Sequence, residues 1–184
     1  VPFFYCSTVG DVGLFVGDLG EKYTYIATDG NGNKNEFQCA PYTRIPDVFE
    51  KKLSDVHNKR FPVSRALFLC RLFADTMHCP NHTFDEIECI FLKENELPTT
   101  FLTTHWNEEN SNDRVFLKST VEYNKANGLT ISNTNVMTCS VLGSFLAQEV
   151  IKIIGNDAKP LYNVAVTNGI GEGVMVYPVH NLEN

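Results

Sequence analysis

The apolar residues of this chain follow two different periods, which divide it into strand and helix segments. Residues 1–27 combine β-branched and aromatic residues with glycine, which predicts β structure, and 28–44 reads as a polar turn and connecting segment. From Pro46 onwards apolar residues recur every three to four positions, as in amphipathic helices. The last part of the chain predicts one long helix and two short strands, at residues 136–155, 160–169 and 174–177.

The helical middle contains further start and stop signals. Thr83 with Glu86 three residues later forms a capping box, a helix N-terminus signature. A loop is expected from Pro98 to Asn110, and Asn127-Gly128 ends the helix that follows it. The pattern therefore predicts four helices in this region, at Asp47–Leu53, Pro62–His78, 84 to about 94, and 112–125.

Composition narrows the class of protein. With 184 residues, 43% of them hydrophobic, the chain can form one domain, or one domain with a subdomain. The net charge of −7 and the absence of a cluster of Lys and Arg argue against a nucleic-acid partner. No apolar run approaches the roughly 20 residues that span a bilayer, so we expect no membrane segment.

The six cysteines are scattered, without the paired spacing of a disulfide framework. Most lie inside apolar patterns, so we expect buried thiols in a reducing compartment, where the sequon at Asn81 carries no sugar. They are Cys6, Cys39, Cys70, Cys79, Cys89 and Cys139.

Three short motifs suggest ligand sites but fail on their spacing. The cluster at residues 78–82, with two His and one Cys, lacks the second ligand pair of a zinc site. The string at 29–33 opens like a calcium loop, but its sixth position is Lys34 and its twelfth is Ala40. The three glycines at 169–173 precede a strand, whereas a nucleotide-binding string opens a helix.

The long helix at 136–155 carries the most informative string of the chain. It contains Gly143 and, four residues later, Ala147-Gln148-Glu149; after it come Pro160-Leu161-Tyr162-Asn163 and a short strand closed by Asn168-Gly169. This order resembles the Gly-Gly-x-x-Ala-Gln-Glu helix of enzymes that activate ubiquitin-like modifiers, with its Pro-Leu-x-Asn segment and Asp-Gly ending. Two positions depart from that pattern, since Ser144 replaces the second Gly and Asn168 replaces Asp.

A second stretch, near the N-terminus, resembles the same family. An aromatic-rich strand at 1–6 leads through a Gly turn to a strand that ends in Asp18-Leu19-Gly20. The two matching blocks cover roughly a third of the chain. Together they resemble the C-terminal part of an inactive-type adenylation half of an activating enzyme.

The resemblance implies an α/β fold, namely the C-terminal part of a Rossmann-like adenylation fold with a helical insertion. Strands of that fold and a connecting segment would occupy 1–45, the helical insertion 46–130, and the return helix with the terminal strands 131–184. The implied family-signature positions are Asp18, Leu19, Gly20, Gly143, Ala147, Gln148, Glu149, Asn163 and Gly169. We expect the chain to be preceded by an N-terminal half in the parent protein.

The resemblance also implies a role without catalysis in this chain. It is most similar to the non-catalytic subunit of a heterodimeric activating enzyme of the SUMO type, whose partners are the catalytic subunit and a SUMO-type modifier. ATP and Mg²⁺ would be held mainly by the catalytic subunit, so no catalytic, cofactor or metal residue is assigned here, Cys139 included. We expect a nuclear or cytoplasmic location, and we expect part of the helix at 136–155 to contribute to the subunit interface.

Two alternatives stay open at the level of sequence. One is the inactive adenylation half of a single-chain ubiquitin-activating enzyme, although the short stretch between Gly20 and the first helix leaves little room for the extra β domain of those enzymes. The other is a stand-alone α/β protein-interaction module, which would need no partner subunit.

Overall fold

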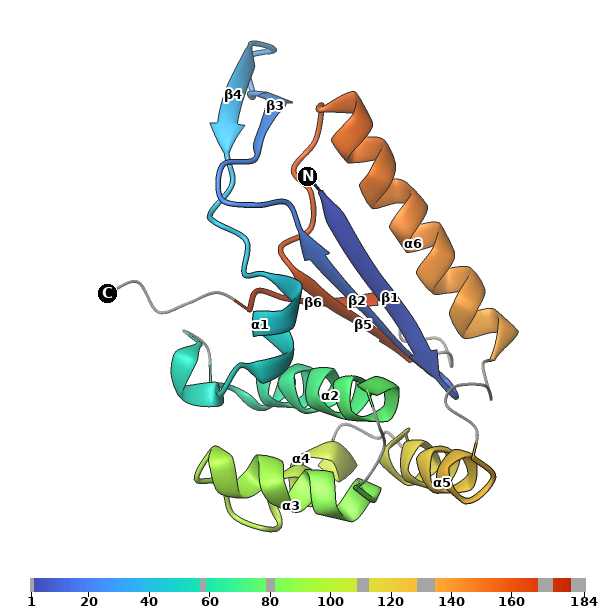
Figure 1. Ribbon diagram of the computed structural model, residues 1–184. Coiled ribbons are helices and arrows are strands. Elements are labelled where there is room, and N and C mark those ends of the chain that lie inside the picture. The colour runs from blue at the N-terminus through green and yellow to red at the C-terminus, as the bar shows by residue number, and fades with distance from the viewer. Residues whose placement is uncertain are drawn as a thin grey trace.

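The computed structural model describes residues 2–56, 59–78, 82–108, 113–128, 135–168 and 174–179 (Figure 1). Helices account for 50% and strands for 22% of these described residues, and both sheets are antiparallel. The α/β class expected from the sequence is thus confirmed as a mixed α/β fold.

The main sheet has four antiparallel strands in the order β1-β2-β5-β6. A tight turn at Gly10, whose φ is +57°, joins β1 to β2, and glycine adopts this left-handed conformation without steric cost. The predicted N-terminal strand pair and the two C-terminal strands are confirmed. Their bounds are Phe3–Val9 (β1), Val12–Asp18 (β2), Val164–Asn168 (β5) and Val174–Tyr177 (β6).

A separate hairpin projects beyond the main sheet, formed by β3 (Thr24–Thr28) and β4 (Lys34–Gln38) (Figure 1). The carboxylate of Asp29 accepts hydrogen bonds from the backbone N–H groups of Asn31 and Asn33, at 2.9 and 2.8 Å, and so fixes the turn. The sequence did not predict β4, because all five of its residues are exposed and no apolar alternation marks them.

The middle of the chain is helical as predicted, with one additional helix. The capping box at Thr83 is present, with the Glu86 N–H donating to the Thr83 hydroxyl. The expected loop at 98–110 is wrong, because residues 101–108 form a helix that buries Leu102 and Trp106, four residues apart on one face. The bounds are Ile45–Glu50 (α1), Phe61–His78 (α2), Phe84–Glu94 (α3), Phe101–Glu108 (α4) and Asp113–Ala126 (α5), with a short 3₁₀ turn at Leu53–Asp55.

The main sheet is covered on both faces, and the alternation of its side chains separates two apolar clusters. Leu14 and Val16 of β2 belong to the large core that includes α2, whereas Phe15 between them packs with Leu142 and Phe145 on the other side. Figure 1 shows the long helix α6 (Val136–Gly155) along one face of the sheet, while α1 and α2 lie on the other.

Helix α6 begins and ends at asparagines. The Asn135 side chain accepts a hydrogen bond from the Met137 N–H at 2.8 Å, a side-chain N-cap. At the other end Gly155 is still helical, and Asn156 takes the left-handed conformation with φ of 50°. The left-handed residue that ends the helix is thus Asn156 and not Gly155, and Asn is the other residue type that occupies this position readily.

Candidate functional site

The two sequence blocks that carry the family resemblance lie side by side in the fold. The Gly17 N–H, next to Asp18, donates to the carbonyl oxygen of Asn163 at 2.7 Å. Leu19, which is buried, belongs to a cluster that also contains Ile153 of α6 and Tyr162. Residues more than 130 positions apart thus form one junction between β2, the end of α6 and the segment before β5.

Asp18 and Gly20 form the turn that ends β2. The Gly20 N–H donates to Asp18 Oδ1 at 2.9 Å, and Gly20 has a φ of +82°, which favours glycine. This turn directs Leu19 into the apolar cluster with Cys39 and Tyr42. The Asp-Leu-Gly string therefore has a local structural explanation.

Glu149 fastens α6 to the segment that leads into β5. Its side chain is 2% exposed, and its two oxygens accept hydrogen bonds from the Leu161 N–H at 2.7 Å and from Lys152 Nζ at 2.5 Å. A buried carboxylate is stable only when charged and polar partners satisfy it, and here both oxygens have one. Of the Ala147-Gln148-Glu149 string, Glu149 is the member that faces the interior.

Asn163 holds the last described segment of the chain in place. It is fully buried; its Nδ2 donates to the Val179 carbonyl at 3.0 Å, and its Oδ1 accepts from the Val179 N–H at 2.9 Å. The Thr43 hydroxyl donates to the same Val179 carbonyl at 3.2 Å. Gly169, the remaining signature position of this block, lies outside the described residues.

Gly143, Ala147 and Gln148 lie apart from this junction, on the exposed side of α6. A Cβ added at Gly143 would meet no atom within 4 Å. The structure therefore brings Asp18, Leu19, Gly20, Glu149 and Asn163 together, and it places the other three signature residues that it describes on the surface.

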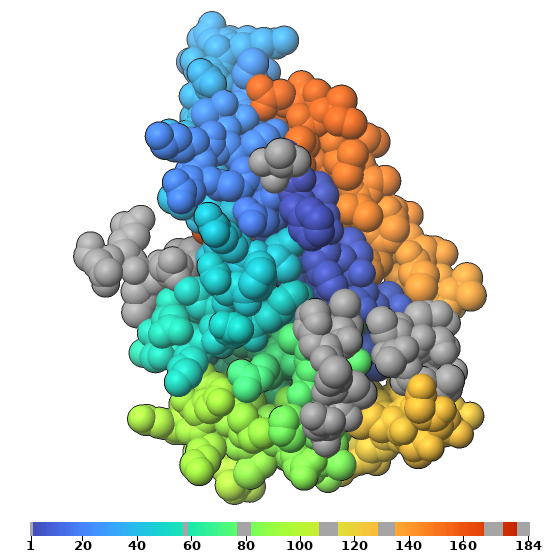
Figure 2. All heavy atoms as spheres, in the orientation of Figure 1, coloured from blue at the N-terminus to red at the C-terminus, as the bar shows by residue number. Residues whose placement is uncertain are grey.

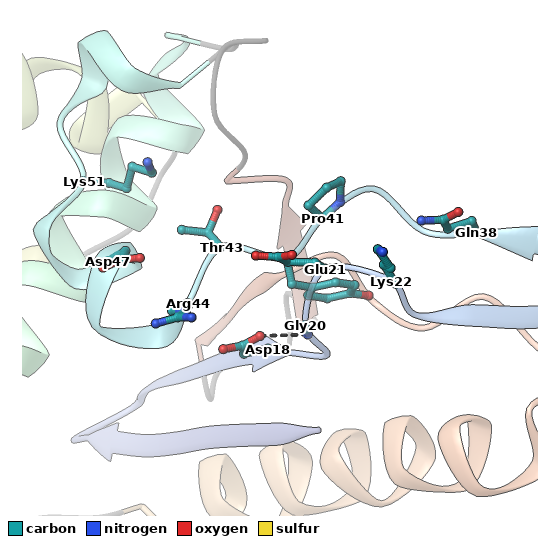
Figure 3. A pocket seen from close by; sticks show the side chains of 11 residues that line it. Asp18, Gly20, Glu21, Lys22, Gln38, Pro41, Thr43, Arg44, Asp47 and Lys51 are labelled. Carbon is teal, nitrogen blue, oxygen red and sulfur yellow. Dashed lines mark hydrogen bonds between the residues drawn. The ribbon is translucent and has the colours of Figure 1, made fainter. Parts of the chain in front are cut away.

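An open cavity of about 1180 Å³ borders the Asp18–Gly20 turn (Figure 3). The turn and the residues after it form one side, and α1 with the segment before it forms the other. Its charged lining residues include three acids, Asp18, Glu21 and Asp47, and three bases, Lys22, Arg44 and Lys51. The sequence did not single out this cavity, because most of its charged residues are ordinary surface residues brought together only by the fold.

The cavity has no sign of a dedicated anion or metal site. Its acids and bases are interleaved, so neither sign of charge dominates. Across the part of the chain that the structure describes, no three His, Cys, Asp or Glu side chains are grouped to hold a metal ion. Of the motifs weighed from the sequence, residues 79–81 and 169–173 fall outside that part.

Two tyrosines link the segment before α1 to the segment before β5. Tyr42 donates its hydroxyl to the Leu161 carbonyl at 2.9 Å, Tyr162 donates to the Pro41 carbonyl, and the two rings lie 4.6 Å apart. Burial, with a smaller contribution from Cys39, raises the pKa of Tyr162 to about 12, and burial also raises the pKa of Tyr42.

The raised pKa of Tyr162 predicts that the protein loses stability at alkaline pH. The unfolded phenol of Tyr162 ionises near its usual pKa of 10.0, whereas the folded phenol keeps its proton up to about 12. The contribution of Tyr162 to stability is therefore complete below pH 10 and is lost as the pH rises to 12. Urea unfolding at several pH values should show a shallower decline for Tyr162→Phe than for the native chain over this interval, and equal slopes would contradict the prediction.

The described cysteines are free thiols, as expected, but their burial differs from the expectation. Cys39 and Cys70 are buried, and burial raises the pKa of Cys70 to about 12 and that of Cys6 to about 11. Cys89 on α3 and Cys139 on α6 are exposed, and the Cys139 thiol lies 3.7 Å from the Thr8 hydroxyl of β1. Cys79 lies outside the described residues.

Neither a scan against protein-family models nor a search of curated proteins finds a match to this chain. The resemblance to modifier-activating enzymes therefore depends on the motif residues and on where the fold places them.

Proposed function

We propose that this chain is part of the non-catalytic subunit of a ubiquitin-like-modifier activating enzyme, most similar to the SUMO type. The observation that carries the proposal is the junction described above. The two motif blocks meet through the Gly17–Asn163 hydrogen bond and through the packing of Leu19 against Ile153 and Tyr162. A chance resemblance would not require the two blocks to be neighbours.

Two buried residues support this proposed role. Glu149 and Asn163, the two buried polar members of the motifs, are engaged with backbone groups of their own chain. The partner, the catalytic subunit, would then carry out the reaction. It would use ATP and Mg²⁺ to adenylate the C-terminus of a SUMO-type modifier and would then form a thioester with it. The present chain would support the adenylating subunit in the nucleus or the cytoplasm.

The finer fold proposal is a Rossmann-like adenylation sheet that continues beyond β1. Within the described sheet β1 is an edge strand with one neighbour, and its seven residues include no charge and no proline. Natural edge strands are commonly protected by such residues, so an unprotected edge favours pairing with a further strand. The inactive half of a single-chain ubiquitin-activating enzyme would share this feature, and it remains the second candidate.

Affinity purification of the full-length parent chain from its own cells, followed by mass spectrometry, tests the proposal. We expect a larger subunit with an ATP site and a catalytic Cys to co-purify, and the complex to form a thioester with a SUMO-type modifier when ATP and Mg²⁺ are added. A parent chain that already contains both halves would favour the single-chain enzyme. A monomeric chain without either would favour a stand-alone interaction module.

A further inference from the structure

The chain contains three Asn-Gly dipeptides, whose local sequence makes them chemically alike. They are Asn31-Gly32, Asn127-Gly128 and Asn168-Gly169. Asparagine is a thermolabile residue, because the backbone nitrogen of the next residue can attack its side-chain amide carbon. A glycine in the next position has no Cβ to hinder this attack and leaves the backbone free to rotate. The fold then decides which of the three dipeptides reacts.

Asn127 is held away from this reaction at the end of α5. Its Nδ2 donates to the Tyr123 carbonyl at 2.8 Å, and its backbone N–H donates to the carbonyls of Tyr123 and Asn124. The N–H of Gly128, whose nitrogen would be the nucleophile, donates to the Lys125 carbonyl at 3.1 Å. Both reacting groups are therefore fixed on helix carbonyls, and the end of the helix must open before they can meet.

Asn168 is held by the main sheet. It is the last residue of β5, and its backbone is paired with Val12 of β2. Its own side-chain carbon can approach the next backbone nitrogen only if the main chain rotates out of this paired conformation. Gly169 lies outside the described residues, so the protection of this dipeptide is argued from the pairing of Asn168 alone.

Asn31 lies in the turn between β3 and β4 and has neither kind of restraint. Figure 2 shows this hairpin at the upper end of the molecule. Asn31 is exposed, and within the described part of the chain its carboxamide makes no hydrogen bond. A Cβ added at Gly30 or Gly32 would meet no atom within 4 Å, so the turn has room to move. The Gly32 N–H donates to the Asp29 carbonyl at 3.0 Å, a bond in an exposed turn, where local opening is easy.

We propose that Asn31 is a site of spontaneous deamidation, which converts the tip of the β3–β4 hairpin to isoaspartate and aspartate. The Gly32 nitrogen attacks Cγ of Asn31. A C–N bond forms, the bond between Cγ and Nδ2 breaks, and ammonia leaves with the proton from the Gly32 nitrogen. Water then opens the resulting succinimide. Opening at Cγ gives aspartate, and opening at the main-chain carbonyl gives isoaspartate, whose main chain is longer by one carbon atom.

The isoaspartate product is expected to open the hairpin. In the native turn, Asp29 Oδ1 accepts from the N–H groups of Asn31 and Asn33, and the Asp29 N–H donates to the Asn33 carbonyl at 2.8 Å. An extra carbon atom in the main chain of the turn moves Asn33 out of this geometry. Because a two-stranded hairpin is only marginally stable, its link to the end of α6, from the Ile26 N–H to the Asn156 carbonyl, is then weakened.

The test ages the purified protein at neutral pH, well below its unfolding temperature, and measures deamidation at each dipeptide by peptide mass spectrometry. In the folded protein Asn31 is expected to react about tenfold faster than Asn127 or Asn168, or more, because those sites must first give up hydrogen bonds. In urea the three dipeptides should react at similar rates, since only the fold distinguishes them.

Asn33 is the matched control within the same hairpin. It is exposed like Asn31, but Lys34 follows it, and its Nδ2 donates to Asp29 Oδ2 at 3.3 Å. Asn33 should therefore remain intact while Asn31 reacts.

Asn31→Asp separates the new charge from the longer main chain. This variant has the carboxylate but a normal backbone, so the Ile26 N–H should exchange with solvent as slowly as in the native protein. The isoaspartate form is separated by chromatography and identified by enzymatic carboxyl methylation. Its Ile26 N–H should exchange about tenfold faster, because the hairpin that protects it has opened.

Equal deamidation at the three dipeptides of the folded protein, or reaction at Asn31 only in urea, would overturn the assignment of this site. Native exchange of the Ile26 N–H in the isoaspartate form would overturn the opening of the hairpin. Neither measurement involves a catalytic subunit, so both results are independent of the proposed function.

Discussion

Phe68→Ala should lower the free energy of unfolding by about 3–5 kcal/mol, the usual range for removing a fully buried aromatic ring. Phe68 is fully buried on α2, and its ring meets those of Phe84, Phe91 and Trp106 edge-to-face at 5.6, 5.5 and 6.0 Å. Removing it leaves a cavity where α2, α3 and α4 pack together. For a chain of this length each kcal/mol lowers the melting temperature by about 2–4 °C, so thermal unfolding followed by circular dichroism measures the effect.

Tyr123→Ala is the matched control, since it also removes an aromatic ring from the helical region. Tyr123 lies on α5 and is 55% exposed, so its loss should cost less than about 1 kcal/mol. Similar losses for Phe68→Ala and Tyr123→Ala would mean that the three helices do not share the core described here.

The helices and strands with strong apolar periodicity could be predicted from the sequence. The regularly spaced apolar residues of α2 predicted that helix, although residues 63–70 are buried on all sides, and the capping box at Thr83 places the start of α3. The hairpin strand β4 and helix α4 could not be predicted with the same rules. One is entirely exposed, and the other is a short helix whose burial depends mainly on the Leu102 and Trp106 pair.

The candidate site was predictable in its residues but not in its geometry. The motif strings identified Glu149 and Asn163, yet their roles depend on Leu161 and Val179, whose backbone groups they bind. Such partners are set by tertiary packing and leave no trace in local sequence. Likewise, the sequence alone does not say which apolar residues of α6 face the sheet; Phe145 does, since its ring lies 5.2 Å from that of Phe15.

The second large effect is expected at Glu149, where replacement by leucine should cost about 3 kcal/mol. The substitution leaves the Leu161 N–H without its acceptor and removes the partner of Lys152. Lys152 is 34% exposed and can turn toward water, so most of the cost comes from the backbone N–H. The measurement is the free energy of unfolding in urea, where the midpoint should fall without a change in slope.

Glu149→Gln separates the hydrogen bond from the charge. Its amide oxygen can still accept from the Leu161 N–H, while the attraction to Lys152 is lost, so we expect a loss of only about 1 kcal/mol. Equal losses for the glutamine and leucine variants would assign the stability to the charge instead. Because Glu149 faces the interior, Glu149→Gln should still bind the proposed catalytic subunit with native affinity. A folded Glu149→Gln chain that fails to bind would instead give the last residue of the Ala147-Gln148-Glu149 string a role in the partner interface.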